Sequence, residues 1–295
     1  MSLPQLTRSR TLLTHEVQVV NESGEVSLRH VPSEKPLTLY LDRHELVTVM
    51  TAGTQPELLA LGWVRNQRFV QRIEDIAAVQ VDWDVGACVI TRHAAAQNDA
   101  SPVPLHDGAA GASAGLLAEP APPAPVPVQA RRKTVTSGCG QGTMFGNLMD
   151  YVEGITLPAH RVGRSVIQAM AETIRLQASL YKISGSVHGC ALFDGEQMLL
   201  FTEDVGRHNA LDAIAGWMWL HGVDGNDKLL YTTGRLTSEM VIKAAQMGVS
   251  IVVSRSGVTE MGLQVARRLG ICLIARCINR HFLVYSGEQR IDLEC

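Results

Sequence analysis

Hydrophobic and polar residues alternate with a period of two in the N-terminal part of the chain, which predicts half-buried antiparallel strands. One short helix, Pro56 to Asn66, is expected to interrupt them. We therefore predict a small β-rich N-terminal part over residues 1–92. The alternating hydrophobic positions are Val17, Val19, Val26, Leu28, Leu37, Leu39, Leu41, Val79, Val81, Trp83 and Val85.

Residues 93–133 break this pattern. The segment is rich in alanine, proline and glycine and has almost no large apolar residue. Such a composition buries too little apolar surface to offset the entropy of ordering the chain. We predict a disordered linker or an inserted loop.

Helical spacing replaces alternation within residues 134–295, which we predict to form an α/β domain. An apolar stripe predicts a helix that Gly185 ends as its C-terminal cap, and Asp194-Gly195 predicts a β-hairpin. Strands then alternate with helices, as is typical of βαβ units and a parallel sheet. The stripe consists of Val166, Met170, Ile174, Ala178 and Tyr181; the helices lie near 207–221, 237–248 and 259–270, and the strands near 228–233, 250–255 and 271–276.

Composition narrows the class of protein. The chain has 295 residues, of which 46% are hydrophobic, and a net charge of −3. A charge so near neutral argues against bulk nucleic-acid binding, which needs a basic face. The first residues contain no apolar run typical of a secretory signal, and no stretch approaches the length of a membrane helix. We expect a soluble, cytoplasmic protein that binds neither nucleic acid nor a membrane.

Three predicted strand ends each bring an arginine together with small or hydroxylated residues. Ligands of an open parallel sheet bind where such strand ends meet helix N-termini. Free backbone N–H groups, the helix dipole and a guanidinium together favour an anion, above all a phosphate. We predict a phosphate-bearing ligand here, although any single arginine is equally consistent with a helix cap or a solvated rim. The candidates are Gly234 and Arg235 at the first end, Arg255 at the second, and Arg276, Cys277, Ile278, Asn279, Arg280 and His281 at the third.

The segment "TEDVGRHNALDA" crowds charged and amide side chains between an apolar strand and an amphipathic helix. Such a cluster is either a capped, solvated turn or a binding site, and the pattern alone identifies no ligand. The same two interpretations hold for His188, which lies just before a buried strand. The candidate binding residues are His188, Arg207, His208 and Asn209.

Cys139 has the clearest local signal of reactivity. It lies in "TSGCGQGTMFG", between glycines that leave the thiol without side-chain cover. Sulfur transfer requires a thiolate that can meet first a donor persulfide and then an acceptor. We therefore predict that Cys139 is a sulfur-carrying thiol, with an incidental surface thiol as the alternative. The cysteines expected to be structural are Cys88, Cys190, Cys272, Cys277 and Cys295.

These segments also carry a resemblance. "EDVGRHNALD", "TGRLTSEMVIKAAQMGV" and "SGSVHGCAL" strongly resemble the FdhD family, the accessory sulfurtransferases of formate dehydrogenases. "EKPLTLYL" and "PELLALGWVRNQ" look like N-terminal segments of that family. The resemblance covers nearly the whole chain except the alanine- and proline-rich insert.

The resemblance implies a fold similar to the cytidine deaminases, a three-layer α/β/α sandwich, with a smaller β-rich N-terminal subdomain. It implies that Cys139 accepts persulfide sulfur from a cysteine desulfurase. The sulfur would pass to a molybdenum cofactor, Mo-bis(molybdopterin guanine dinucleotide), before the cofactor enters the catalytic subunit of formate dehydrogenase. Arg276 to His281 match the family's cofactor-binding stretch. The resemblance also implies a cytoplasmic homodimer, and no zinc is expected.

The chain departs from the family pattern in three places. Most members carry two cysteines as C-x-x-C on the loop, whereas Gly142 occupies the second position here. A persulfide on Cys139 therefore cannot be resolved as an internal disulfide. The family often has lysine at the position of Ala213, and the insert before Cys139 is unusual.

Two other functions compete with sulfur transfer. A zinc-dependent nucleobase or nucleoside deaminase needs H-x-E together with P-C-x-x-C. Here His188 is followed by Gly189 and Cys190, and P-C-x-x-C is absent from the sequence. The other alternative is a non-enzymatic chaperone, which would hold the cofactor without using Cys139.

Overall fold

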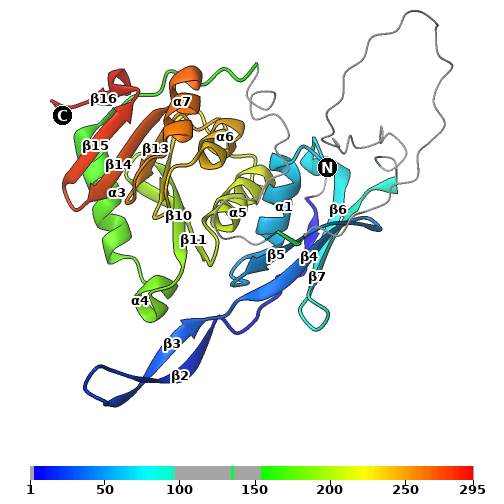
Figure 1. Cartoon of the computed structure of the whole chain (residues 1–295). Helices are drawn as coiled ribbons and strands as arrows, with labels where there is room; N and C mark the ends of the chain where they lie inside the picture. The colour runs from blue at the N-terminus through cyan, green and yellow to red at the C-terminus, as the bar shows by residue number, and fades with distance from the viewer. Residues whose placement is uncertain (1–2, 95, 97–133, 136–153, 295) are drawn as a thin grey trace, which may run out of the picture.

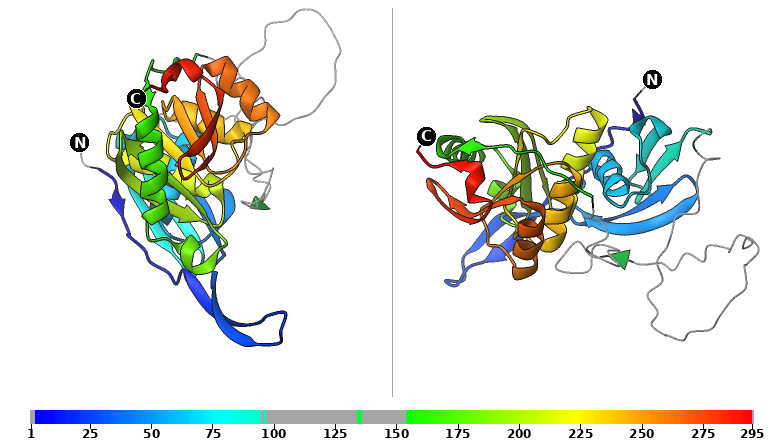
Figure 2. Two further views of the ribbon diagram at one scale, coloured as in Figure 1. Left: turned by 90° about the vertical axis from the view of Figure 1, so that its left-hand side faces the viewer. Right: turned by 90° about the horizontal axis from the view of Figure 1, so that it is seen from above.

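The computed structural model of the protein describes residues 3–94, 96, 134–135 and 154–294. Cys139, Gly142, Cys295 and nearly all of the predicted insert lie outside these residues. Within them the chain forms two 6-stranded sheets, with strand orders β1-β6-β7-β4-β5-β8 and β11-β10-β12-β13-β14-β15 (Figure 1). Helices lie between the two sheets and on the far face of the second (Figure 2).

The N-terminal sheet packs one face against helix α1 (Pro56–Asn66), the helix expected there. Alternate residues such as Leu37, Leu39 and Val79 are buried against it, as the period of two predicts. The strands are β1 (Gln5–Leu6), β4 (Lys35–Leu41), β5 (His44–Thr51), β6 (Ile76–Asp82), β7 (Ala87–Arg92) and β8 (Thr134–Val135), with a 3-10 turn at Ile73–Asp75.

Strands β2 (Thr14–Val20) and β3 (Val26–Pro32) form a separate hairpin that extends from the body of the molecule (Figure 1). The prediction that they are half-buried is confirmed for Val17 and Val19 of β2 but is wrong for β3, where Val26 is 64% exposed and Leu28 is 54% exposed. Alternation correctly identifies the strands. It cannot identify what covers them, and no other described strand pairs with this ribbon.

The C-terminal sheet is mixed, and the expectation of a parallel sheet is correct only for its centre. Strands β12 (Lys228–Thr232), β13 (Ile251–Ser254) and β14 (Cys272–Ile278) are parallel. The outer strands are antiparallel because tight hairpins reverse the chain, one of them at the predicted Asp194-Gly195 turn. These outer strands are β10 (His188–Asp194), β11 (Gln197–Asp204) and β15 (His281–Ser286).

Helices cover both faces of this sheet. Leu192 and Leu230 point to a core under α5, α6 and α7, whereas Phe193 and Tyr231 point to a core under α3. No helix among the described residues has the length and apolar character needed to cross a membrane. The helices are α3 (Arg164–Leu176), α5 (Arg207–Leu220), α6 (Ser238–Gln246) and α7 (Glu260–Leu269).

The expected single helix up to Gly185 is instead two helices, α3 and the short α4 (Leu180–Ser184). Gly185 ends α4 with a φ of +72°, so the cap was placed correctly. The break between α3 and α4 is caused by a side chain that is distant in sequence. The carboxylate of Glu203 accepts hydrogen bonds from the backbone N–H groups of Leu180 (2.5 Å) and Tyr181 (3.0 Å), which fixes a new helix start.

Helices α1 and α5 join the two halves of the molecule at very close range. A Cβ atom on Gly62 would lie 1.7 Å from the carbonyl oxygen of Asp212, and one on Gly216 would lie 2.0 Å from that of Leu58. Only glycine fits at this crossing. The N-terminal sheet is therefore anchored to α5, the helix that begins in the "EDVGRHNA" segment. The chain closes with Glu288–Arg290 as a 3-10 turn and with β16 (Ile291–Asp292) paired to β9 (Val162–Gly163).

Candidate functional site

The loops after β12 and β13 lie against each other, as the sequence predicted for parallel strand ends. Ser254 Oγ donates a hydrogen bond to the carbonyl oxygen of Gly234 (2.6 Å), and the N–H of Arg255 donates to that of Thr232 (3.1 Å). The loops then enter α6 and α7, whose N-caps are Thr237 and Thr259. Arg235 and Arg255 are both exposed on this edge.

Arg276 joins the same edge. Its backbone N–H donates to the carbonyl oxygen of Ser256 (2.8 Å), and its Nη2 lies 3.6 Å from the position of a Cβ on Gly257. The φ of Arg276 is +53°, at the irregularity in the pairing of β14 with β15. We call the set formed by Arg207, Gly234, Arg235, Arg255, Gly257 and Arg276 the strand-end row.

The rest of the third predicted end points elsewhere. The carbonyl oxygen of Arg280 accepts a hydrogen bond from Gln168 Nε2 on α3 (3.2 Å). Cys277 is 3% exposed and lies in the core on the α3 side. Ile278, Asn279 and His281 are exposed around the turn between β14 and β15. Of this stretch, Arg276 is the residue that contacts the loop after β13.

Arg207, the first residue of α5, lies across the β12 loop. A Cβ on Gly234 would be 2.7 Å from Arg207 Cδ, so the absence of a side chain at Gly234 makes room for the Arg207 side chain. Arg207 is only 6% exposed, and among the described residues its Nε has no hydrogen-bond partner. A buried donor without a partner is costly, which makes this N–H a natural contact for an anion.

His188 lies in the same cationic surroundings. Its Nδ1 is 3.4 Å from Thr233 Oγ1. Burial lowers the pKa of His188, and the positive charges of Arg207, His208 and Arg235 lower it further. The structure therefore places His188, the first residue of β10, close to Arg207 and Arg235 of the strand-end row.

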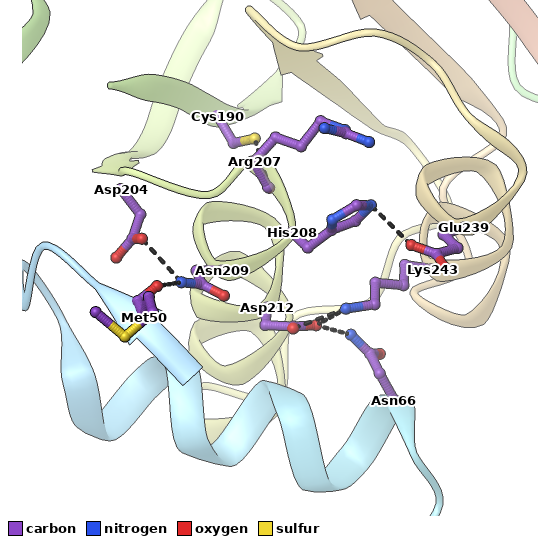
Figure 3. A network of polar contacts seen from close by, with 10 residues as sticks. All are labelled: Met50, Asn66, Cys190, Asp204, Arg207, His208, Asn209, Asp212, Glu239 and Lys243. Carbon is purple, nitrogen blue, oxygen red and sulfur yellow. Dashed lines mark hydrogen bonds and ion pairs between the residues drawn. The ribbon is translucent and has the colours of Figure 1, made fainter. Parts of the chain in front are cut away.

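His208 follows Arg207 and contacts α6. Its Nε2 lies 3.0 Å from Glu239 Oε2 (Figure 3), and the two side chains are 10% and 18% exposed. Burial lowers the pKa of His208, the contact with Glu239 raises it, and Lys243 and Arg207 lower it. Glu239 was not among the residues predicted from the sequence.

Other members of the "EDVGRHNA" segment hold the molecule together. Asn209 Nδ2 donates to the carbonyl oxygen of Met50 (2.7 Å), so its amide group faces the N-terminal half rather than the strand-end row (Figure 3). Burial raises the pKa of Asp204 to about 6, despite the hydrogen bonds that its carboxylate accepts. The donors are Thr51 Oγ1, the N–H groups of Ala52 (3.2 Å) and Gly206 (3.1 Å), and Asn209 Nδ2 (2.8 Å).

A buried ion pair continues this network along α5. Lys243 Nζ lies 2.7 Å from Asp212 Oδ2, both side chains are 2% exposed, and Asn66 Nδ2 donates to Asp212 Oδ1 (2.7 Å). Sequence reasoning missed this triad. Its only local signal was a lysine inside the apolar stretch "MVIKAAQ".

The described cysteines behave as structural residues, as predicted. Cys88, Cys190, Cys272 and Cys277 are all buried. Burial raises the pKa of the Cys190 and Cys272 thiols to about 12 and that of Cys277 to about 11, so these sulfurs stay protonated and unreactive. Burial likewise raises the pKa of Cys88. Cys139 is outside the described residues, so its accessibility remains a prediction.

Two surface hollows lie away from the strand-end row. One, of about 320 Å³, lies beside α4 and β11, and the other, of about 250 Å³, lies between α7 and the turn after β15. Within the described part of the chain, no three His, Cys, Asp or Glu residues are grouped so as to hold a metal ion.

Comparison with known proteins agrees with this architecture. The chain is similar to the sulfur carrier protein FdhD of Bacillus subtilis, with 29% identity over 92% of this chain and 94% of the relative. It is 27% identical to the protein of the same name from Bacillus licheniformis, over 97% and 98% of the two chains. A crystal structure assigned to a formate dehydrogenase accessory protein from Desulfotalea psychrophila has a similar fold, with a TM-score of 0.69, 23% identity and coverage of 95% and 98%.

The family model matches residues 32–292, which include the second sheet, all strands of the first sheet except β1, the α1–α5 contact and the strand-end row. Because that match spans most of the chain, the protein belongs to the FdhD/NarQ family.

Proposed function

We propose that the protein is a sulfur carrier that matures formate dehydrogenase by passing sulfur from Cys139 to a molybdenum cofactor. The observation that carries the proposal is the strand-end row, where Arg207 at the start of α5, Arg235 and Arg255 in the loops after β12 and β13, and Arg276 in β14 lie at one edge. Arg207 Nε is left without a partner among the described residues. Its chemistry suits the pyrophosphates of a bis(molybdopterin guanine dinucleotide). The name shared by the relatives, sulfur carrier protein FdhD, supports the same role.

The first step is thiol–persulfide exchange. The thiolate of Cys139 attacks the terminal sulfur of a persulfide on a cysteine desulfurase. The S–S bond of the donor breaks, the donor cysteine leaves as a thiolate, and Cys139 carries the sulfur as a persulfide. The exchange needs no external oxidant or reductant.

The second step delivers that sulfur to the cofactor, which is the cargo of the reaction. The S–S bond of the Cys139 persulfide breaks and Cys139 recovers its thiol. The metal, in its Mo(IV) state, supplies the two electrons that turn the sulfane sulfur into a sulfido ligand and becomes Mo(VI). With Gly142 where a second cysteine is usual, Cys139 is regenerated by transfer to the cofactor rather than by an internal disulfide.

In this proposal the protein partners are a cysteine desulfurase and the catalytic subunit of formate dehydrogenase, and the site of action is the cytoplasm. The likeness to cytidine deaminases that the resemblance implies concerns the fold alone and stays a prediction. We propose no deaminase activity and no zinc, because His188-Gly189-Cys190 lacks the glutamate that would shuttle the proton.

A homodimer completes the proposal, and the edge of β2 is its best-suited interface. At the two ends of the hairpin, the backbone N–H of Asn21 donates to the carbonyl oxygen of Glu25 (3.1 Å), and the N–H of Ser33 donates to that of Leu13 (2.8 Å). Hydrogen-bonded pairs alternate along an antiparallel ladder, so the odd-numbered residues of β2 are the ones bonded to β3. The backbone groups of the even-numbered residues of β2, such as Gln18, therefore point away from β3. Two β2 strands can pair antiparallel about a two-fold axis at Val17. This register places Glu16 opposite Gln18 of the second copy, and it brings no two like charges together.

Mass spectrometry tests the carrier chemistry. The protein is incubated with a cysteine desulfurase and cysteine, then alkylated and digested. We expect an adduct of about 32 Da, the mass of one sulfur, on the Cys139 peptide, and none on the four buried cysteines. An adduct that survives in a Cys139→Ala variant would contradict the proposal.

Maturation assays separate the carrier from a cofactor-holding chaperone. A carrier predicts that Cys139→Ala and Arg276→Gln both abolish activation of formate dehydrogenase. A chaperone predicts that Cys139→Ala retains it while Arg276→Gln does not. Full activation by the Cys139→Ala variant would therefore favour the chaperone.

A further inference from the structure

One feature of the strand-end row opposes anion binding. Glu239 places a carboxylate on the first turn of α6, 3.0 Å from His208, beside a row otherwise lined by arginines. A carboxylate next to a phosphate site repels the ligand by simple electrostatics. Glu239 can favour anion binding by stabilising a positive charge on a neighbouring group. His208, which Glu239 contacts, can carry such a charge.

We propose that His208 binds the phosphate groups of the ligand as an imidazolium that takes up one proton on binding, and that Glu239 is the positioning residue that holds this imidazolium. The inference rests on the proposed function, since it concerns the same row. The proton comes from solvent and returns to solvent on release.

The geometry supports this pairing in two ways. The Arg207 and His208 side chains extend toward the same side of the start of α5 (Figure 3), and the charge of Arg207 lowers the pKa of His208, so the ring lies in the field of the guanidinium whose Nε lacks a partner. Glu239 contacts His208 Nε2, which leaves Nδ1 as the remaining ring nitrogen for a ligand or solvent. Both side chains are largely buried, so their interaction is weakly screened by salt.

The charges around His208 explain why protonation is linked to binding. Burial opposes the imidazolium, and Arg207 on α5 and Lys243 on α6 oppose it further, whereas Glu239 favours it. His188 on β10 lies in the same field. The pKa of His208 is thus below its ordinary value in the free protein, and an anion beside the ring raises it. Affinity should therefore fall as the pH rises from the pKa of His208 in the free protein, below 6.5, to its higher pKa in the complex.

The test is calorimetric titration with guanosine diphosphate mannose across about pH 5.5 to 8.5, using the full chain. Both phosphates of this probe are esterified, so it lacks the terminal phosphate group that titrates near about pH 6. We expect wild-type affinity to fall with rising pH. His208→Gln should flatten that profile, whereas the control His221→Gln, at the exposed C-terminal end of α5, should retain it.

Glu239→Gln distinguishes three possible roles of Glu239 by its effect on affinity. If Glu239 supports the imidazolium, its loss weakens binding at pH 7 by about three- to tenfold and moves the pH profile to lower pH. If it is only a nearby negative charge, its loss tightens binding. If it is a neutral staple between helices, glutamine preserves binding. Either of the last two results overturns the inference.

Glu260→Gln is the matched control. Glu260 is an exposed carboxylate in the first turn of α7, at the neighbouring strand end. Removing its charge should leave the affinity unchanged or slightly higher, with the same pH profile as wild type. A wild-type protein that fails to bind the probe at any pH would overturn the cofactor site itself. Binding with a profile that His208→Gln leaves unaltered would overturn only the present inference.

Discussion

At the scale of residues, the polar segment at the start of α5 serves two purposes. Arg207 and His208 lie at the strand-end row, whereas Asp204, Asn209 and Asp212 bind the N-terminal half of the molecule. The sequence predicted a dense polar cluster but could not divide it. Neighbouring residues of a helix face different directions, and the partner of each comes from a distant segment.

Stability should depend on pH through Asp204. Its pKa is raised to about 6 in the folded protein by burial, from an ordinary value of 3.8. A carboxyl with a raised folded-state pKa stabilises the fold at low pH and loses that contribution as the pH rises through the folded pKa. Wild type should therefore gain about 2 kcal/mol of unfolding free energy, relative to Asp204→Asn, between about pH 7 and pH 4. Urea unfolding of both proteins at several pH values measures this difference, and parallel pH profiles would contradict it.

The buried pair of Lys243 and Asp212 should be sensitive to loss of either partner. Lys243→Met leaves a buried carboxylate whose described partner is Asn66, and should cost about 3–5 kcal/mol in urea unfolding. Lys243→Met combined with Asp212→Leu should cost less than the single change, because no charge is stranded. Arg175→Met, which breaks an exposed and solvent-screened pair with Glu172, is the control and should leave the urea unfolding midpoint close to that of wild type.

At the scale of elements, the hydrophobic period predicted most helices and strands close to their observed bounds. α1 begins and ends where expected, and α5 ends one residue before the expected His221. These elements are encoded locally by amphipathic spacing and by turn residues. The break between α3 and α4 was missed, because the group that starts α4 is the carboxylate of Glu203, more than 20 residues away in sequence.

The contact between α1 and α5 makes a prediction at this scale. Gly216→Ala would normally strengthen a helix by about 1 kcal/mol. Here the added Cβ would lie 2.0 Å from the carbonyl oxygen of Leu58, so the helices must separate. We expect a net loss of about 1–3 kcal/mol of stability in thermal or urea unfolding. A stabilised Gly216→Ala protein would show that the helices can move apart without cost.

At the scale of the whole molecule, the β2–β3 hairpin is the element least explained by the fold. Its apolar residues Val20, Val26, Leu28 and Val31 are exposed, and in the described structure its sheet has 2 strands. An isolated hairpin of this kind is marginal in water and has open edges. Pairing of β2 with a second copy would close one edge and extend the ribbon across two chains.

Gln18→Pro tests this dimer directly. The N–H that proline removes points away from β3, so the hairpin should persist while pairing with another strand is blocked. Sedimentation should give twice the 32.0 kDa chain mass for wild type and a monomer for Gln18→Pro. Gln18→Thr keeps the N–H and should remain dimeric. A monomeric wild type, or a dimeric proline variant, would contradict this interface.

The sequence by itself determined the local elements and the family. It also identified the arginines after β12, after β13 and within β14. Amphipathic periods, turn residues and motifs are properties of neighbouring residues, so they can be interpreted without a fold. Tertiary structure decided which polar groups face the strand-end row and which join the two halves. It also decided the strand directions of the mixed sheet, the break after α3 and the pairing of His208 with Glu239. Those outcomes depend on contacts between segments distant in sequence, whose geometry no local pattern encodes.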